Sequence, residues 1–196
     1  MGNYTKWTSE RNTNEGDYVV VLFISRNKDN DNLFDFKERR KAYFRRNNPE
    51  AIMKEFDHFV QDGVCGELCR LYISVNPRNS ESVRKALIHQ LIDVEYPDFT
   101  NINAYIAGIA AKKEHALYSH WLFDFDLDDE SMVMQFIDDI HKIDPMMVIS
   151  YKKTVNGYAV ITDHGFDTRK LMETWGESVT LKRDDLILVK WATKED

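Results

Sequence analysis

Two aspartates separated by one residue lie within the hydrophobic segment from Trp121 to Asp129 and give the clearest chemical signal in the chain. Side chains alternate between the two faces of a strand, so Asp124 and Asp126 would share one face and the aromatic residues beside them the other. The Cα atoms of the two aspartates would then lie roughly 7 Å apart. Carboxylates this close repel each other unless a cation offsets their charge, and Mg²⁺ or Mn²⁺ prefers such oxygen ligands. We therefore expect Asp124 and Asp126 to be metal ligands and catalytic groups.

The acidic residues that follow this pair have a simpler explanation. Asp128, Asp129 and Glu130 precede a segment whose apolar residues recur at helical spacing. Carboxylates at a helix start accept hydrogen bonds from its first N–H groups and complement its dipole. We expect these three residues to cap a helix.

The composition is that of a globular, acidic chain. Hydrophobic residues make up 43% and aromatic residues 12% of its 196 positions, and the formal net charge is −7. This charge argues against a broad electrostatic grip on nucleic acid, although a local basic groove is compatible with it. No apolar segment approaches the ~18 residues of a membrane span, so we expect no membrane partner. The two cysteines, Cys65 and Cys69, form no disulfide framework and are expected to be free thiols in a reducing compartment.

The first half of the sequence predicts an α/β extension. Residues 1–16 are polar and lack periodicity, which predicts a flexible tail, and residues 17–196 are expected to form a single domain. Apolar runs and alternation indicate strands, and helical spacing after Pro49 and Ser80 indicates helices. The expected strands are 18–24, 39–46 and 68–76, and the expected helices begin at 49, 80 and about 103.

The second half predicts the order strand, helix, strand, strand, helix, strand. The strand with the aspartates is followed by a helix after residue 130, then by strands 146–151 and 158–162 joined at an Asn156-Gly157 turn. A helix from 167 and a last strand at 186–191 complete the series. This is the order of the ferredoxin-like split unit, so we expect an α/β (α+β) fold with a ferredoxin- or RRM-like core.

The Asp124-Phe125-Asp126 motif in this order of elements resembles the archaeo-eukaryotic primase superfamily, which includes the primase-polymerases and the polymerase module of bacterial end-joining ligases. That family carries Asp-x-Asp in a hydrophobic strand, Gly-x-His on a later strand, and a third strand that ends in Asp. The segment from Val155 to Ile161 stands where the second motif belongs, and Phe166-Asp167 opens a helix as in the family's layout. The likeness covers about residues 68–191. The strand Arg70–Asn76 and the turn at Asn156-Gly157-Tyr158 also resemble uncharacterised phage proteins, which suggests a divergent, phage-type member.

The chain departs from the family at two of the three motifs. Ala159 stands where the family has its nucleotide-contacting His, and a methyl group donates no hydrogen bond to a phosphate. His164, five residues further on, is the candidate substitute. At the position of the third acid the chain has Val189 or Lys190, and Asp184-Asp185 lies before the strand.

Basic residues form two candidate phosphate-binding groups. The segment Lys37 to Arg46 is either a phosphate-contacting and base-stacking strand or a solvated edge strand, and we expect it to lie beside the Asp pair. Its candidate nucleic-acid contacts are Arg39, Arg40, Arg45 and Arg46. The second group either lines a nucleotide-binding wall or forms exposed polar faces, and consists of Arg70, Tyr72, Arg78 and Lys152, with His164 added from the resemblance. Residues 182–185 are expected to form a loop with internal charge balance.

Together these features favour a phage-type protein that binds a nucleotide or nucleic-acid phosphate on a primase-polymerase-like scaffold. If it is active, the resemblance implies nucleotidyl transfer dependent on Mg²⁺ or Mn²⁺. The alternative is a non-catalytic protein that sequesters a nucleotide or binds a host protein against host defence. The expected location is the cytoplasm, that of the host if the protein is phage-encoded.

Overall fold

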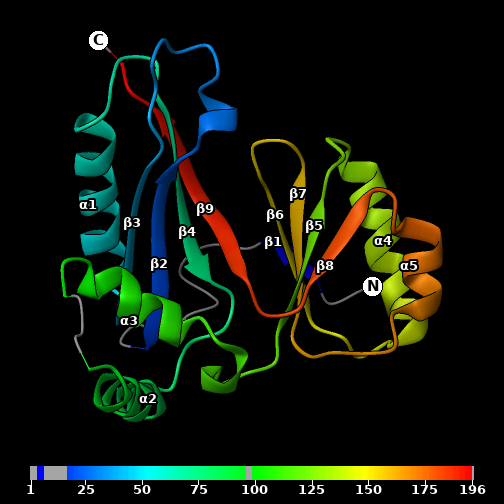
Figure 1. Cartoon of the computed structure of the whole chain (residues 1–196). Helices are drawn as coiled ribbons and strands as arrows, with labels where there is room; N and C mark the ends of the chain where they lie inside the picture. The colour runs from blue at the N-terminus through cyan, green and yellow to red at the C-terminus, as the bar shows by residue number, and fades with distance from the viewer. Residues whose placement is uncertain (1–3, 7–16, 96–98, 196) are drawn as a thin grey trace.

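The chain folds into two β-sheets that face each other (Figure 1). The computed structural model describes residues 4–6, 17–95 and 99–195. Helices and strands are mixed along the whole chain, which confirms the expected α/β (α+β) class.

The first sheet is antiparallel and has the strand order β3-β2-β4-β9. Alternate residues of β2, such as Val19 and Phe23, pack against α1 (Pro49–Gln61) in one buried cluster with Phe56. Helix α1 begins where the Asn48 side chain accepts a hydrogen bond from the N–H of Ala51. The strands are β2 (Tyr18–Ser25), β3 (Arg39–Arg46), β4 (Leu68–Ser74) and β9 (Leu186–Thr193).

The second sheet has the strand order β1-β6-β7-β5-β8 and carries the aspartates on β5. The phenylalanines of β5 face α4 (Glu130–Ile143) and α5 (Arg169–Trp175), where Phe123 and Phe125 pack edge-on against Phe136. Asp129 caps α4 by accepting a hydrogen bond from the N–H of Ser131, as expected. The strands are β1 (Tyr4–Lys6), β5 (Trp121–Phe125), β6 (Ile149–Lys153), β7 (Tyr158–Thr162) and β8 (Val179–Lys182).

Both ends of the chain differ from the sequence-based expectation. Within the expected tail, Tyr4–Lys6 forms β1, which pairs in parallel with β6, whereas residues 1–3 and 7–16 lie outside the described residues. The strand that follows α5 in the second sheet is β8, which was not expected. The strand expected in that place, β9, instead pairs with β4 in the first sheet. The chain thus crosses from one sheet to the other at residues 183–185.

A small apolar cluster joins the inner faces of the two sheets. It contains Leu122, Ala159 and Ile161 from the second sheet, Ile187 from β9 of the first sheet, and Val75, the residue after β4. All five side chains are buried. Burial of such side chains stabilises a fold by about 1.5–3 kcal/mol for each large one. The two sheets are therefore held at one end by direct packing.

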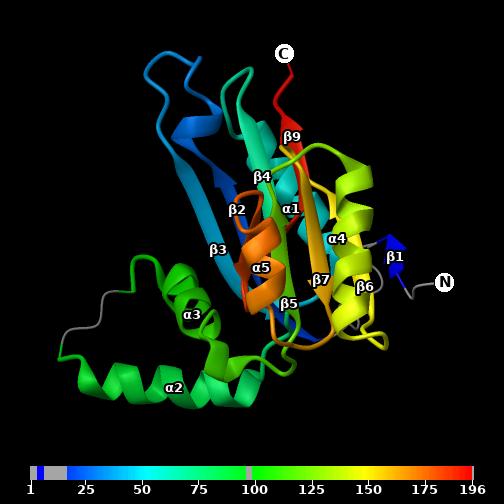
Figure 2. The same cartoon turned by 90° about the vertical axis from the view of Figure 1, so that its right-hand side faces the viewer.

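Two further helices, α2 (Ser80–Asp93) and α3 (Ile102–Ala110), cover part of the inner face of the first sheet. Figure 2 and Figure 1 both place them at the end of this sheet away from the C-terminus. Neither these helices nor any other helix in the described part of the chain combines the length and apolarity needed to cross a membrane.

A buried ion pair fixes the crossing between the sheets. Asp184 accepts hydrogen bonds from Arg78 Nη1 at 2.7 Å and from Asn76 Nδ2 at 2.9 Å. The side chains of Arg78 and Asp184 are only 1% and 6% exposed. The residues after β4 are thereby tied to the loop between β8 and β9.

We expect Asp184→Ala to lower the free energy of unfolding by about 3–5 kcal/mol, because it leaves the Arg78 guanidinium buried without its counter-ion. Urea denaturation followed by circular dichroism measures this change. Asp185→Ala is the matched control, since Asp185 is exposed and should change the free energy by less than about 0.5 kcal/mol. Equal effects of the two substitutions would contradict this role of Asp184.

Candidate functional site

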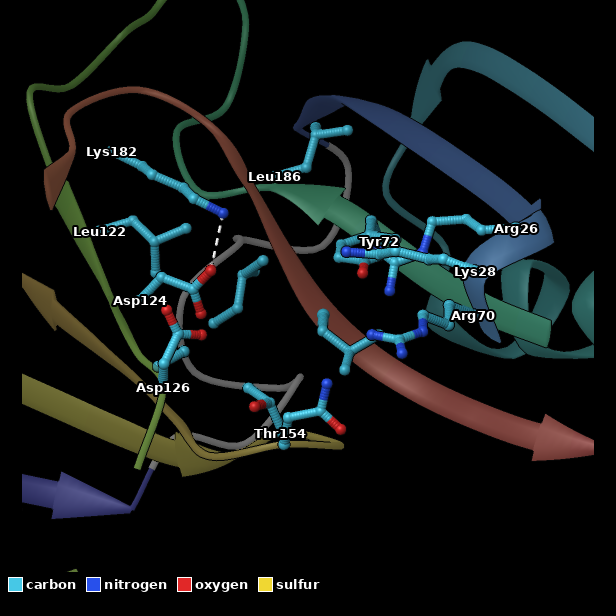
Figure 3. Close-up of a pocket in the computed structure, with 14 residues that line it drawn as sticks. Arg26, Lys28, Arg70, Tyr72, Leu122, Asp124, Asp126, Thr154, Lys182 and Leu186 are labelled. Atoms are coloured by element: carbon cyan, nitrogen blue, oxygen red, sulfur yellow. Dashed lines mark hydrogen bonds and ion pairs between the residues drawn. The ribbon is translucent and has the colours of Figure 1, made fainter. Parts of the chain in front are cut away.

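A cavity of about 180 Å³ opens between the inner faces of the two sheets, and we call it the cleft. Figure 3 shows acidic side chains on one of its walls and basic side chains on the other. Asp124 and Asp126 come from β5 and the residue after it. The opposite wall carries Arg26, Lys28, Arg70 and Tyr72, and the remaining lining includes Leu122, Thr154, Asn156, Ala159, Lys182 and residues 186–188.

The two carboxyl groups point into this one cavity from an internal strand of the sheet, as the alternation in the sequence predicts. Asp124 is partly buried and Asp126 is exposed at the end of β5. The backbone N–H of Asp126 donates to the carbonyl of Ser178 at 3.0 Å, so β8 holds the end of the strand in place. The backbone that presents the pair is therefore fixed on both sides of β5.

Lys182 is the cation nearest to the acidic wall. Its Nζ donates to Asp124 Oδ2 at 2.7 Å, and the two side chains are 37% and 35% exposed. Burial alone would lower the pKa of Lys182, but the hydrogen bond and charge of Asp124 outweigh it and raise the pKa above its ordinary value. Lys182 thus remains an ammonium group next to the Asp pair.

Sequence reasoning did not single out Lys182, because residues 182–185 were expected to balance their charges within one loop. That expectation is wrong: Lys182 pairs with Asp124 and Asp184 pairs with Arg78. The guanidinium of Arg183 lies 5.2 Å from the ring centroid of Trp121. The ionic partners of Lys182 and Asp184 thus come from residues far away in the sequence.

The basic wall is organised around Asp29. This carboxylate accepts from Arg26 Nε and from Arg70 Nη2, each at 2.6 Å. Arg70 is 6% exposed, and its Nε is buried with no hydrogen-bond partner among the residues that the structure describes. Such a buried donor is unfavourable, but protein atoms enclose it, as they enclose the Nε of Arg78 outside the cleft, so it does not by itself indicate a ligand.

Two of the wall's cations, Arg26 and Lys28, were not predicted as site residues. Arg26 directly follows β2, and Lys28 belongs to the short 3₁₀ helix η1 (Asn27–Asp29). The spacing Arg26-x-x-Asp29 was the available signal, since it allows the i,i+3 ion pair that forms here. Of the predicted nucleotide contacts, Arg70 and Tyr72 line the cleft.

The other predicted contacts, Arg78, Lys152 and His164, do not line it. Arg78 is buried against Asp184. His164 lies beyond the end of β7, where Asp144 and Asp163 pair with it, and the hydrogen bond that it donates to Asp144 is the main cause that raises its pKa. If these three residues contact a nucleotide, as expected from the sequence, they do so outside the cleft.

Lys152 faces the first sheet from β6. Its Nζ donates to the carbonyl of Val189 at 2.7 Å, at the point where the register between β4 and β9 shifts past Val189. Burial lowers the pKa of Lys152 to about 8. The side chain therefore connects the two sheets beside the cleft.

The basic strand β3 is one of the two edge strands of the first sheet, with β2 and β4 between it and β9, and none of its residues lines the cleft. Arg39 and Arg45 point toward α1, where they pair with Glu67 and Glu55. Arg40 and Arg46 alternate with them and face the other side, and the Arg46 guanidinium lies 5.3 Å from the ring centroid of Tyr18. The segment is thus an edge strand, and its expected position beside the Asp pair was wrong.

Ala159, which the resemblance places at the position of the family's His, is directly opposite Asp124 in the pairing of β7 with β5. It is 3% exposed and belongs to the apolar cluster that joins the sheets. Its methyl group therefore forms part of the apolar base of the cleft, next to the first aspartate.

The side chains present do not fit a resident pair of metal ions. Within the described residues, no group of three or more His, Cys, Asp or Glu side chains is placed to hold a metal. Asp124 and Asp126 are the only carboxylates among the residues that line the cleft, and Asp124 is already hydrogen-bonded to Lys182. Hard divalent cations take six or more oxygen ligands, so most of the shell would have to come from water or a ligand.

Comparison of the chain with protein-family models, with curated proteins and with solved structures finds no match. The function is therefore inferred from the cleft.

The pKa of Lys152 gives a testable dependence of stability on pH. In the unfolded chain this lysine keeps its ordinary pKa, so between pH 8 and about 10 the unfolded state binds the extra proton and stability rises with pH. Lys152→Met should remove this rise, so its stability relative to wild type should fall as pH increases from 8 to 10. Urea denaturation at several pH values measures the difference.

The exposed Lys170 provides the control for loss of one positive charge, since Lys170→Met should leave the pH profile parallel to that of wild type. A Lys152→Met profile that is also parallel to wild type would contradict the buried position of the Lys152 ammonium.

Proposed function

We propose that this protein binds a nucleotide, or the phosphate of a nucleic acid, in the cleft between its two sheets. The observation that carries this proposal is the cluster of four cationic side chains, two of them guanidinium groups, that lines a single cavity. Guanidinium groups bind phosphate oxygens through paired, charge-assisted hydrogen bonds. A phosphate in the cleft would lie beside the guanidinium groups of Arg26 and Arg70.

The balance of charge in the cleft supports an anionic ligand. Four cationic side chains line it, against the carboxylates of Asp124 and Asp126, with Asp29 lying behind the basic wall. The cationic residues are Arg26, Lys28, Arg70 and Lys182. In a chain with a net charge of −7, this concentration of positive charge would attract a phosphate locally.

The size of the cleft limits which part of a ligand it holds. Its volume of about 180 Å³ is smaller than the roughly 300–1,000 Å³ typical of sites for drug-sized ligands. It accommodates a phosphate or a short polyphosphate more readily than a complete nucleotide. We therefore propose that the phosphates enter the cleft and that the nucleoside remains outside it.

We also propose that the scaffold is primase-polymerase-like and phage-type. Strands β6, β7, β5 and β8 are neighbours in that order with antiparallel pairings, as in a ferredoxin-like split unit. Asp124 and Ala159 are cross-strand neighbours, so the positions that correspond to the family's first two motifs meet at one site. These two observations support the resemblance on geometric grounds.

We expect Arg70→Gln to weaken the binding of tripolyphosphate and of ATP by roughly ten- to a hundredfold, the effect of losing a charge-assisted hydrogen bond. Isothermal titration calorimetry measures both affinities. Arg45→Gln is the matched control, because it also removes an arginine from an ion pair but does so on the α1 side of the first sheet. If Arg45→Gln weakens binding as much as Arg70→Gln, the ligand does not bind at the cleft wall.

Metal-dependent nucleotidyl transfer is the second candidate function, and the Asp pair in the cleft favours it. Three features act against it: the methyl group of Ala159 at the His position, the Lys182 contact with Asp124, and the lack of a third carboxylate in the cleft lining. Binding tolerates such losses better than catalysis, which needs reacting groups aligned in the transition state. We therefore favour a binding role, such as nucleotide sequestration.

In a primer-extension and priming assay with Mg²⁺ and then Mn²⁺, we expect little or no synthesis by the wild-type protein, because the described cleft lining offers two carboxylates for two metals and one of them is paired with Lys182. The product is measured on a denaturing gel beside that of Asp124→Ala. Synthesis by wild type that disappears in Asp124→Ala would establish the second candidate instead.

A further inference from the structure

The cation that offsets the Asp pair is part of the protein. Repulsion between Asp124 and Asp126 requires positive charge nearby. Lys182 supplies it from the neighbouring strand β8, with Nζ 2.7 Å from Asp124 Oδ2. Figure 3 shows this ammonium group on the same side of the cleft as Asp124, joined to its carboxylate by a dashed line.

The strand pairing fixes the place of this lysine. Lys182 is directly opposite Leu122, and Thr180 is directly opposite Asp124, so both β8 residues share the inner face with the aspartate. The half-buried aliphatic stem of Lys182 therefore extends from the Lys182–Leu122 pair toward the Thr180–Asp124 pair, where its ammonium group reaches the Asp124 carboxylate. An ammonium group has three N–H donors, so one can bind Asp124 while the others remain available for a second anion.

We propose that Lys182 is the resident cation of the Asp pair, and that the cleft therefore binds its phosphate ligand without a divalent metal ion. The claim that phosphate binds without a metal ion rests on the proposed function. The role of Lys182 as the cation of the Asp pair does not depend on that function. In this arrangement Lys182 lies between the carboxylates and the bound phosphate. It binds the phosphate as a point charge, facing the Arg70 guanidinium across the cleft.

The proposal predicts that one substitution has opposite effects on two ligands. Lys182→Met keeps an unbranched apolar stem but removes the ammonium group. The Asp pair should then attract a divalent cation, because a competing positive charge a few ångströms away is gone. Phosphate binding should weaken, because the cleft loses a cation and its net charge becomes more negative.

The experiment titrates two probes, Mn²⁺ alone and tripolyphosphate in the presence of EDTA, into wild type and Lys182→Met. Free Mn²⁺ is followed by electron paramagnetic resonance and tripolyphosphate by calorimetry. We expect Lys182→Met to bind Mn²⁺ roughly tenfold or more tightly than wild type, and to bind tripolyphosphate roughly tenfold more weakly. Adding Asp124→Asn to Lys182→Met should abolish the gain in Mn²⁺ binding.

Lys190→Met is the matched control, because Lys190 is 35% exposed and pairs with Asp57 at 2.8 Å outside the cleft. It should change neither affinity. Thermal denaturation shows that each variant is folded, and Lys182→Gln replaces Lys182→Met if the latter is not.

Equal Mn²⁺ binding by wild type and Lys182→Met would overturn the role of Lys182. Tripolyphosphate binding that is lost in EDTA and restored by Mn²⁺ would overturn the metal-independence. If tripolyphosphate binds to no variant with or without Mn²⁺, the proposed function fails. A gain of Mn²⁺ binding in Lys182→Met would in that case still support Lys182 as the resident cation, and its absence would overturn that role as well.

Discussion

The repulsion between two carboxylates on one face of β5 is the constraint that organises the cleft. Asp124 and Asp126 project into the space between the sheets, and uncompensated negative charge on the partly buried Asp124 would be unfavourable there. Strand β8 and the residue before it stabilise this arrangement through two contacts. Lys182 of β8 brings an ammonium group to Asp124. The carbonyl of Ser178, the residue before β8, accepts a hydrogen bond from the backbone N–H of Asp126. The acidic wall and its cation are thus built from adjacent strands of the same sheet.

The cleft exists because the two sheets meet along only part of their inner faces. Leu122, Ala159 and Ile161 pack against Val75 and Ile187, and this apolar contact closes the base. The Arg78–Asp184 pair fixes the crossing from β8 to β9, so Lys182 and the β9 residues at 186–188 that also line the cleft keep their places. Away from this apolar contact, the side chains that face each other across the cleft are charged, and the space between them stays open for a ligand.

Much of the fold could be predicted from the sequence, because the signals for its longer elements are local. The alternation from Trp121 to Leu127 correctly placed the aspartates on one face, and the apolar run at Tyr18–Ile24 and the basic strand at Arg39–Arg46 are strands as expected. Strand β8 was missed because its four residues are too few for a clear period and lead directly into charged residues. Strand β9 was recognised as a strand, but periodicity does not tell which sheet a strand joins.

The site was harder to predict because its decisive contacts are long-range. Arg70 pairs with a residue 41 positions away, and Arg78 with one 106 positions away. Composition alone could not distinguish Arg70, which lines the cleft, from Arg78, which is buried in a structural ion pair. The same limit applies to the basic strand β3, whose arginines are paired with residues of α1 and the segment after it. Charge density along a sequence indicates where cations are numerous, whereas the cleft depends on which of them the fold brings to one cavity.

The most direct test of this account is a crystal structure of the protein grown with pyrophosphate and Mn²⁺, with diffraction data collected at the manganese absorption edge. The account predicts pyrophosphate in the cleft, in contact with Arg70 and Lys182, and no anomalous peak between Asp124 and Asp126. A manganese peak bridging the two carboxylates, with Lys182 displaced, would contradict it, as would a cleft without pyrophosphate.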